Sequence, residues 1–255
     1  MPEELQMRVH GPATAPTLVF LPGLHGDWTL VTSFRMRLGN AVRFVEFTYP
    51  RTLEWSLDDY ADAIADALHK AGIDHGWVLG ESYGSQIVWP LATRGRFKVK
   101  GIILAGGFVR HPMNWAVRLA ARVGKGVSLS WLARFLFWYA RYARFRHRHA
   151  PETLSSIHEF VERRTELDRH AAIHRLHLIA NNDPRPLAST VTVPVHHLSG
   201  LWDPVVPWMP VRPWLKHHCP GWKANRLIPS ADHNVLGTAP AESALQVLKW
   251  MNAPG

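Results

Sequence analysis

The stretch WVLGESYG, residues 77–84, joins an apolar run to a serine that stands between two glycines. The apolar run at 77–80 predicts a short strand, and a helix is predicted from about Ser85 to Thr93. Glycines on both sides of Ser82 permit a tight strand-to-helix turn, because side chains at those positions would collide with neighbouring backbone. The helix N-terminus behind the serine would present a positive dipole end to a developing oxyanion. The stretch therefore predicts a nucleophilic serine exposed at the end of a strand.

Strand and helix patterns alternate on both sides of this stretch. A helix is predicted from Leu57 to Ala71, with Ser56 and Asp59 at the spacing of a capping box. Such alternation is typical of a mainly parallel sheet with helices on both faces. Further strands are predicted at residues 17–21, 42–48, 99–105, 194–199 and 224–228, and a last helix at 239–251.

The alternation stops at Gly106-Gly107. From about residue 108 to residue 181 the sequence reads as helical, without a convincing strand. We therefore expect an α/β core formed by residues 1–107 and 182–255, interrupted by a helical cap or lid at 108–181.

A serine hydroxyl needs a base to become a nucleophile, and the base needs a carboxylate to orient it. Among the 16 histidines, His233 stands out because it follows the last predicted strand and precedes the last helix. Asp203 follows the preceding strand, and such loops at the carboxyl ends of parallel strands gather active sites. Asp203 could instead be an Asx-turn residue before Pro204. Asp232 is a rival acid, but its adjacency to His233 makes a hydrogen bond to that ring awkward.

An oxyanion hole requires two backbone N–H groups. The N–H of Tyr83, directly after the nucleophile, is the first candidate. The second is expected from the glycine-containing turn at residues 21–28, which follows the strand at 17–21. The same turn could also be a plain connection between a strand and a helix.

These residues resemble the α/β-hydrolase superfamily over most of the chain: the turn at 22–26, the elbow at 80–84 and the Asp203 and His233 loops fall in its order. The resemblance implies an α/β-hydrolase fold with a mostly parallel eight-stranded sheet, helices on both faces, a helical cap insertion and no cofactor. It also implies that Ser82 is the nucleophile, His233 the base and Asp203 the acid, with the N–H groups of Leu24 and Tyr83 as oxyanion donors.

The chain departs from that pattern in two places. Many members carry His-Gly before the oxyanion residue, whereas this chain has Pro22-Gly23 followed by His25-Gly26. The donor is therefore either Leu24 or His25, and Leu24 is preferred because it directly follows the first glycine. The prolines between Pro204 and Pro213 predict that the helix after the acid loop is short or irregular.

Charge is distributed unevenly along the chain. The formal net charge is +9, and no acidic residue occurs between Glu81 and Glu152. The basic, aromatic segment at 130–149 could contact an anionic membrane surface weakly, bind acyl chains with an anionic head, or be a cap helix with solvated arginines. No recognised nucleic-acid module accompanies it, so no nucleic-acid partner is expected.

The remaining chemistry-bearing residues give weaker signals. His25, Trp28 and Trp138 are candidates for lining the substrate pocket, although core packing is the default for each tryptophan. No metal is expected, because the sequence lacks His-Glu-x-x-His and Cys-x-x-Cys, and adjacent histidines on a strand point to opposite faces. The single cysteine, the absence of a secretory signal and the absence of a long apolar stretch lead us to expect a cytoplasmic protein.

The sequence thus predicts a serine hydrolase that cleaves a carboxylic ester or thioester of a small molecule through an acyl-enzyme, with a substrate that could be an acyl chain or an anion. Fold does not decide between this reaction and C–C bond hydrolysis, lactone hydrolysis or perhydrolysis. A non-catalytic ligand-binding protein on the same fold is a further alternative. The sequence does not predict the oligomeric state.

Overall fold

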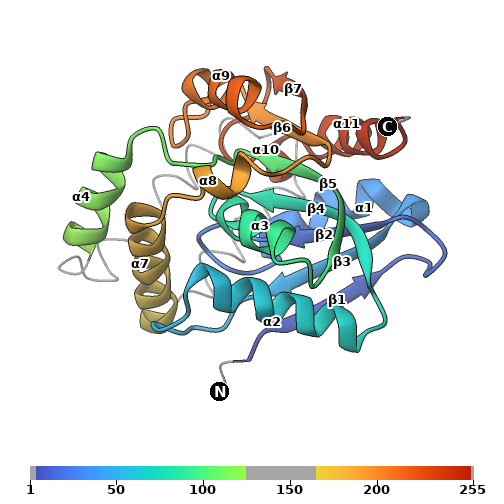
Figure 1. Cartoon of the computed structure of the whole chain (residues 1–255), viewed down its shortest axis with the longest axis horizontal. Helices are drawn as coiled ribbons and strands as arrows, with labels where there is room; N and C mark the ends of the chain where they lie inside the picture. Colours follow the sequence, from blue (N-terminus) through green and yellow to red (C-terminus); the bar gives the residue numbers. More distant parts are fainter. Residues whose placement is uncertain (1–3, 125–164, 254–255) are drawn as a thin grey trace.

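A seven-stranded sheet forms the centre of the computed structural model, which describes residues 4–124 and 165–253 (Figure 1). Its strand order is β1-β3-β2-β4-β5-β6-β7, with β1 antiparallel to β3 and every other neighbouring pair parallel. The strands are β1 (Gln6–His10), β2 (Thr17–Leu21), β3 (Arg43–Thr48), β4 (His75–Glu81), β5 (Lys98–Ala105), β6 (Val195–Gly200) and β7 (Trp222–Ile228).

The expected eight strands are one more than the described residues contain. The six strands predicted from the sequence are all present, and β1 is an additional strand that the sequence analysis missed. β1 lies at the edge of the sheet, and its residues are exposed or only partly buried. Such a strand lacks the continuous apolar run that marks β2 and β4, so its signal in the sequence is weak.

Helices cover both faces of the sheet, as predicted. The apolar side chains of α2, α3 and α9 belong to the cluster on one face, and those of α1 and α11 belong to the cluster on the other. The α-helices of the described residues are α1 (Thr32–Leu38), α2 (Leu57–Lys70), α3 (Gly84–Thr93), α4 (Asn114–Gly124), α7 (Glu166–Asn181), α8 (Arg185–Ala188), α9 (Trp208–His218), α10 (Val235–Thr238) and α11 (Pro240–Met251). Short 3-10 helices lie at Thr29–Val31 and Gly39–Ala41.

Two expectations about helix ends have different outcomes. The capping box at the start of α2 is confirmed: Ser56 accepts a hydrogen bond from the Asp59 N–H, and Asp59 accepts one from the Ser56 N–H. The expectation of a short or irregular helix after the acid loop is wrong, because α9 has 11 residues. Pro207 precedes the helix and Pro210 lies in its first turn, where a backbone N–H has no partner within the helix in any case. Only Pro213 removes a hydrogen bond from the interior of the helix.

The helices α4 and α7 are the described parts of the expected cap. They run antiparallel, because the Asn114 side chain at the start of α4 donates to the Ala180 carbonyl, whereas Arg169 in α7 donates to the Gly124 carbonyl. Trp138 and the basic segment at 130–149 lie outside the described residues, so the boundaries of the cap stay a prediction. Within residues 4–124 and 165–253, none of the helices combines the length and the apolar character that crossing a bilayer requires.

Candidate active site

The order of the strands creates a topological switch point at the carboxyl end of the sheet. β2 and β4 are neighbours, but the chain leaves β2 toward the β1 edge and leaves β4 toward the β7 edge. Loops that diverge in this way leave open space between them, and ligands of α/β sheets bind at such switch points. The turn at 22–28 and Ser82 follow these two strands and lie close together, because a Cβ added to Gly23 would lie 3.5 Å from the Ser82 Cβ.

Ser82 occupies a strained turn between β4 and α3. Its φ of 48° is the only positive value for a non-glycine residue within the described part of the chain. This left-handed conformation costs an L-residue about 1–2 kcal/mol. The turn is held by a hydrogen bond of 3.0 Å from the Ser82 N–H to the Ala105 carbonyl at the end of β5. A Cβ at Gly80 or Gly84 would meet backbone atoms at 2.8 Å and 2.2 Å respectively, so both positions require glycine.

The structure brings Ser82, His233 and Asp203 together from three separate loops. His233 Nδ1 lies 2.8 Å from Asp203 Oδ2, and His233 Nε2 lies 2.9 Å from Ser82 Oγ. An ionised carboxylate can only accept, so Nδ1 carries the ring hydrogen and Nε2 is left to accept the Ser82 hydroxyl. The sequence prediction therefore placed three residues separated by as many as 151 positions at one point of the fold.

Asp203 holds its own loop as well as the imidazole. Its Oδ1 accepts from the Val205 and Val206 N–H groups at 2.9 and 2.8 Å, which is the turn that the alternative interpretation proposed. Because Oδ2 faces His233, the geometry of Asp203 is compatible with both interpretations at once. The rival Asp232 accepts from the Asn234 N–H at 3.0 Å.

Two titratable groups, the partly buried His233 and the buried Glu81, shape the electrostatics beside Ser82. Burial lowers the pKa of His233, but the hydrogen bond and charge of Asp203, helped by Glu81 and Asp232, raise it above its usual value of 6.5. Burial raises the pKa of Glu81 to about 7, against the opposing effects of the His233 charge and the Gly23 backbone N–H. The site thus holds an imidazole that readily accepts a proton, next to a carboxyl group that titrates near neutral pH.

The candidate oxyanion donors come from the residue after Ser82 and from the turn after β2. Tyr83 begins the turn into α3, and its side chain is fully buried. Two hydrogen bonds hold the loop that carries Leu24 and His25. The Gly23 N–H donates to Glu81, and the Gly26 N–H donates to the Gly23 carbonyl at 3.0 Å.

Arg175 is a residue of this site that the sequence analysis missed. It lies in α7, is only 2 % exposed, and donates to the Leu24 carbonyl at 3.0 Å and to the Pro50 carbonyl at 3.1 Å. The signal for it in the sequence is slight: Arg175 stands between Ala171 and Ile179 at four-residue spacing, on the buried side of α7. An arginine at such a position is a reason to look for buried acceptors.

A second missed group ties the loop after β5 to the helix behind the nucleophile. The Ser85 hydroxyl lies 2.6 Å from the Ser82 carbonyl oxygen and accepts from the Phe108 N–H at 3.0 Å. The Gln86 side chain donates to the Phe108 and Val109 carbonyls at 2.9 and 2.8 Å. Both side chains are fully buried, so they satisfy backbone groups that would otherwise lack partners.

The three residues that were expected to line the substrate pocket lie in different surroundings. The His25 ring lies against Gly23, which in turn approaches Ser82, as a Cβ added to Gly23 would be 3.4 Å from the ring and 3.5 Å from the Ser82 Cβ. Trp28 is partly buried and packs against the apolar cluster on the face of α1 and α11, with the Arg8 guanidinium 3.9 Å from its ring centroid, and its place in the substrate pocket stays a prediction. Trp138 is outside the described residues.

The adjacent histidines on β6 have separate structural partners. His196 stacks on Trp77 and Trp250, with ring centroids 5.9 and 4.6 Å apart. His197 is buried and bonds the Gly107 carbonyl through Nε2 at 3.1 Å. In the described ranges no group of three or more His, Cys, Asp or Glu side chains is arranged to hold a metal ion.

Solved structures of several enzymes share this architecture. An enol-lactonase from Burkholderia xenovorans LB400 superposes with a TM-score of 0.81 at 17 % identity, over 98 % of this chain and 96 % of that one. The chain has the α/β-hydrolase fold. A thermophilic esterase from Thermogutta terrifontis matches this α/β-hydrolase fold with a TM-score of 0.79 at 18 % identity, over 96 % and 92 % of the two chains. A bromoperoxidase from Bacillus anthracis matches it with a TM-score of 0.80 at 14 % identity, over 98 % and 95 %.

Comparison of the sequence alone gives no match, either to models of protein families or to curated proteins. The α/β-hydrolase fold of the chain is therefore established by the arrangement of its backbone, at sequence identities that carry no information about substrate. The side chains at the carboxyl end of the sheet, rather than the fold, therefore carry the information about its function.

Proposed function

We propose that the chain is a serine hydrolase that cleaves a carboxylic ester or thioester through an acyl-enzyme. The observation that carries the proposal is the hydrogen-bonded chain from Asp203 through His233 to Ser82, at 2.8 and 2.9 Å. The strained backbone at Ser82 supports it, because a fold keeps such a conformation where exposure of the side chain is needed.

In the proposed mechanism, Ser82 Oγ attacks the substrate carbonyl carbon while His233 Nε2 takes the hydroxyl proton. Asp203 holds the imidazole in the correct tautomer and stabilises the imidazolium. The N–H groups of Leu24 and Tyr83 bind the oxyanion of the tetrahedral intermediate, which collapses as His233 protonates the leaving alcohol or thiol. Water, deprotonated by His233, then attacks the acyl-enzyme, and a second collapse releases the acid and restores Ser82.

Other reactions can use the same three side chains. C–C bond hydrolysis, lactone hydrolysis and perhydrolysis differ in the substrate that the pocket admits, and the solved structures with this fold are named for several reactions. A panel of 4-nitrophenyl esters of increasing chain length separates them, because turnover of short linear esters favours an esterase. A ligand-binding protein without turnover has no use for a base aligned on a strained serine.

Labelling by a fluorophosphonate tests the proposed nucleophile. The reagent should form one covalent adduct per chain, located on Ser82 by mass spectrometry, because only the hydroxyl that His233 deprotonates attacks phosphorus readily. Heat-denatured protein should not react, since the imidazole is then no longer beside the serine. An adduct on another serine, or no adduct on folded protein, contradicts the assignment.

The pH profile tests the proposed base. kcat/KM for a neutral ester should fall on the acid side with a midpoint above 6.5, because a protonated imidazole cannot accept the Ser82 proton and the pKa of His233 is raised. The variant Glu81→Gln should move this midpoint to lower pH, since the Glu81 charge is one of the groups that raise that pKa. A flat profile from pH 5 to 8, or a midpoint that moves to higher pH in Glu81→Gln, would contradict the assignment of His233 as the base.

A further inference from the structure

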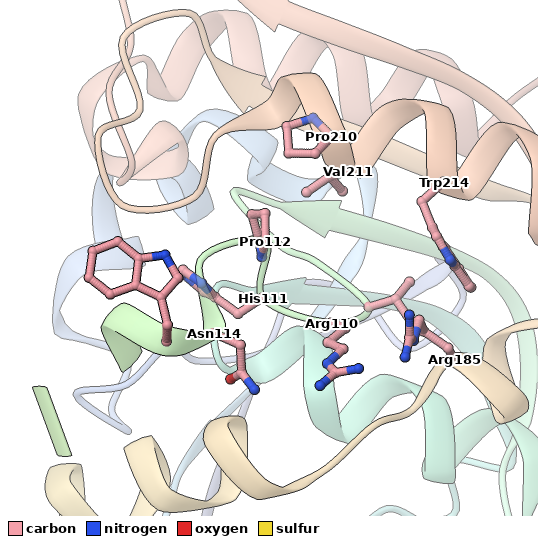
Figure 2. Close-up of a pocket in the computed structure, with 10 residues that line it drawn as sticks. Arg110, His111, Pro112, Asn114, Arg185, Pro210, Val211 and Trp214 are labelled. Atoms are coloured by element: carbon pink, nitrogen blue, oxygen red, sulfur yellow. The ribbon is translucent and has the colours of Figure 1, made fainter. Parts of the chain in front are cut away.

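A cavity of about 400 Å³ opens beside the acid loop, between the segment that follows β5, the start of α8 and the first turns of α9. Figure 2 shows the side chains that surround it, with Arg110 and Arg185 near one another. The residues that matter for its chemistry are Arg110, His111, Trp115, Arg185, Val211 and Trp214. Its volume lies within the range of small-molecule sites, which is about 300–1,000 Å³.

The charged groups of the cavity leave an excess of one positive charge. Arg185 binds Asp183 through Nε and Nη2, at 2.8 Å to Oδ1 and 2.5 Å to Oδ2. Arg110 reaches the same carboxylate only through Nη1, at 3.3 Å. The hydrogen bond from Arg185 lowers the pKa of Asp183, so this carboxylate stays ionised and two guanidinium groups share one anion. Burial lowers the pKa of His111, which is therefore neutral at pH 7.

Arg110 is the cation of this group that can take up an anion. It uses one of its terminal nitrogens, in the longer contact to Asp183, while Arg185 is engaged through two nitrogens and fixed in place. A guanidinium offers a planar set of five N–H donors that matches both oxygens of a carboxylate. The rest of the wall is apolar or aromatic, formed by Trp115, Trp214 and Val211. This combination suits a ligand with an apolar body that ends in a carboxylate.

The cavity adjoins the triad through His111. The His111 ring lines the cavity, accepts from the Met113 N–H at 3.2 Å, and is hydrogen-bonded to the backbone of Val205. Val205 itself donates to Asp203, and His111 lies close enough to His233 for the charge of that ring to lower its pKa. His111 therefore links the lining of the cavity to the loop that carries Asp203.

We propose that this cavity takes the free carboxylate end of the substrate, so that the preferred substrates are esters that carry a second, unesterified carboxylate. The inference rests on the proposed function, and it makes Arg110 and Arg185 determinants of specificity. They should act on the binding of the charged end and leave the chemistry at Ser82 unchanged.

A matched pair of substrates tests this assignment. The mono-4-nitrophenyl ester of adipic acid and 4-nitrophenyl hexanoate have acyl chains of equal length, but only the first has a free carboxylate. The wild type should have the higher kcat/KM for the adipate ester. In Arg110→Gln, KM for the adipate ester should rise about ten-fold, the scale of one charge-assisted contact, while KM for the hexanoate ester changes less than two-fold.

The variants are chosen so that folding and specificity can be separated. Arg110→Gln leaves the Arg185–Asp183 pair intact, whereas the double variant Arg110→Gln/Arg185→Gln removes both cations and should extend the effect. Arg94→Gln is the control, since Arg94 also pairs with an exposed aspartate, Asp62, but at the far end of α3. It should change neither KM. Thermal unfolding of each variant shows whether it is folded under the conditions of the assay.

Each outcome decides the inference. Hydrolysis of both esters with equal changes in Arg110→Gln, or a wild-type preference for hexanoate, overturns the assignment of the cavity and leaves the proposed function standing. If neither ester is hydrolysed, the proposed function fails for these substrates, and calorimetric titration with adipate tests the cavity by itself. Adipate binding that weakens in Arg110→Gln but not in Arg94→Gln supports a carboxylate site, and equal or undetectable binding refutes it.

Discussion

Ser82→Ala is expected to lower kcat for ester hydrolysis by about 10⁴- to 10⁶-fold, because it removes the covalent route and leaves only binding and the oxyanion hole. Asp203→Asn should cost about 10⁴-fold by a different cause. An amide that donates to Nδ1 favours the imidazole tautomer with hydrogen on Nε2, which can no longer accept the Ser82 proton. Steady-state kinetics with a short 4-nitrophenyl ester measures both losses.

Asp232→Asn is the matched control for Asp203→Asn. It makes the same chemical change in the neighbouring carboxylate, which accepts from the Asn234 N–H. We expect kcat to stay within a few-fold of wild type, because Asp203 still orients His233. An equal loss in both aspartate variants, or substantial turnover by Ser82→Ala in protein free of wild type, would contradict the proposed triad.

Arg175→Met is expected to reduce kcat by about 10- to 100-fold with little change in KM. Loss of a whole oxyanion donor costs about 10²- to 10³-fold, and Arg175 acts on that donor indirectly, by holding the Leu24 carbonyl and hence the loop that presents the N–H. The effect should fall on kcat because the oxyanion forms only in the transition state. The variant should also be less stable, since buried carbonyls of Leu24 and Pro50 lose their partner at a cost of about 1–3 kcal/mol each.

Gly26 provides an independent test of the same role for Arg175. A Cβ at Gly26, which has a φ of +80°, would lie 2.4 Å from Arg175 Nη1, so Gly26→Ala should displace the guanidinium. The double variant Gly26→Ala/Arg175→Met should then lose no more activity than the worse single variant. Arg169→Met, on the same helix but bonded to the Gly124 carbonyl, is the control. A loss of stability without a loss of kcat, or an equal loss in Arg169→Met, would show that Arg175 is only structural.

The meeting of Ser82, His233 and Asp203 could be predicted from the sequence, because it depends on local patterns and on one geometric rule. Strands read as apolar runs, the glycines around Ser82 mark a turn, and the carboxyl ends of parallel strands meet at one edge of the sheet. The loops that carry Asp203 and His233 follow the neighbouring strands β6 and β7, so their meeting follows from strand order.

The remaining features depend on long-range contacts between side chains, which local sequence patterns do not predict. Arg175 and Leu24 are 151 positions apart, and their hydrogen bond depends on how α7 lies against the core. The cavity with Arg110 and Arg185 likewise arises from three segments that converge. The contact between Trp28 and Arg8 was not predictable for the same reason, because no sequence pattern indicates that this arginine of the edge strand lies over the Trp28 ring. β1 was missed because an edge strand needs only a few buried positions.

The antiparallel pairing of α4 and α7 bears on how long a segment the chain can carry between these two helices. Hydrogen bonds join Gly124 to Arg169 and Asn114 to Ala180, so α4 and α7 are tied together near both of their ends and form a closed stem. The entropy cost of a flexible loop grows slowly, by about 0.6 kcal/mol for each doubling of its length. We therefore expect this stem to accept grafted segments of very different size while the arrangement of Ser82, His233 and Asp203 stays unchanged.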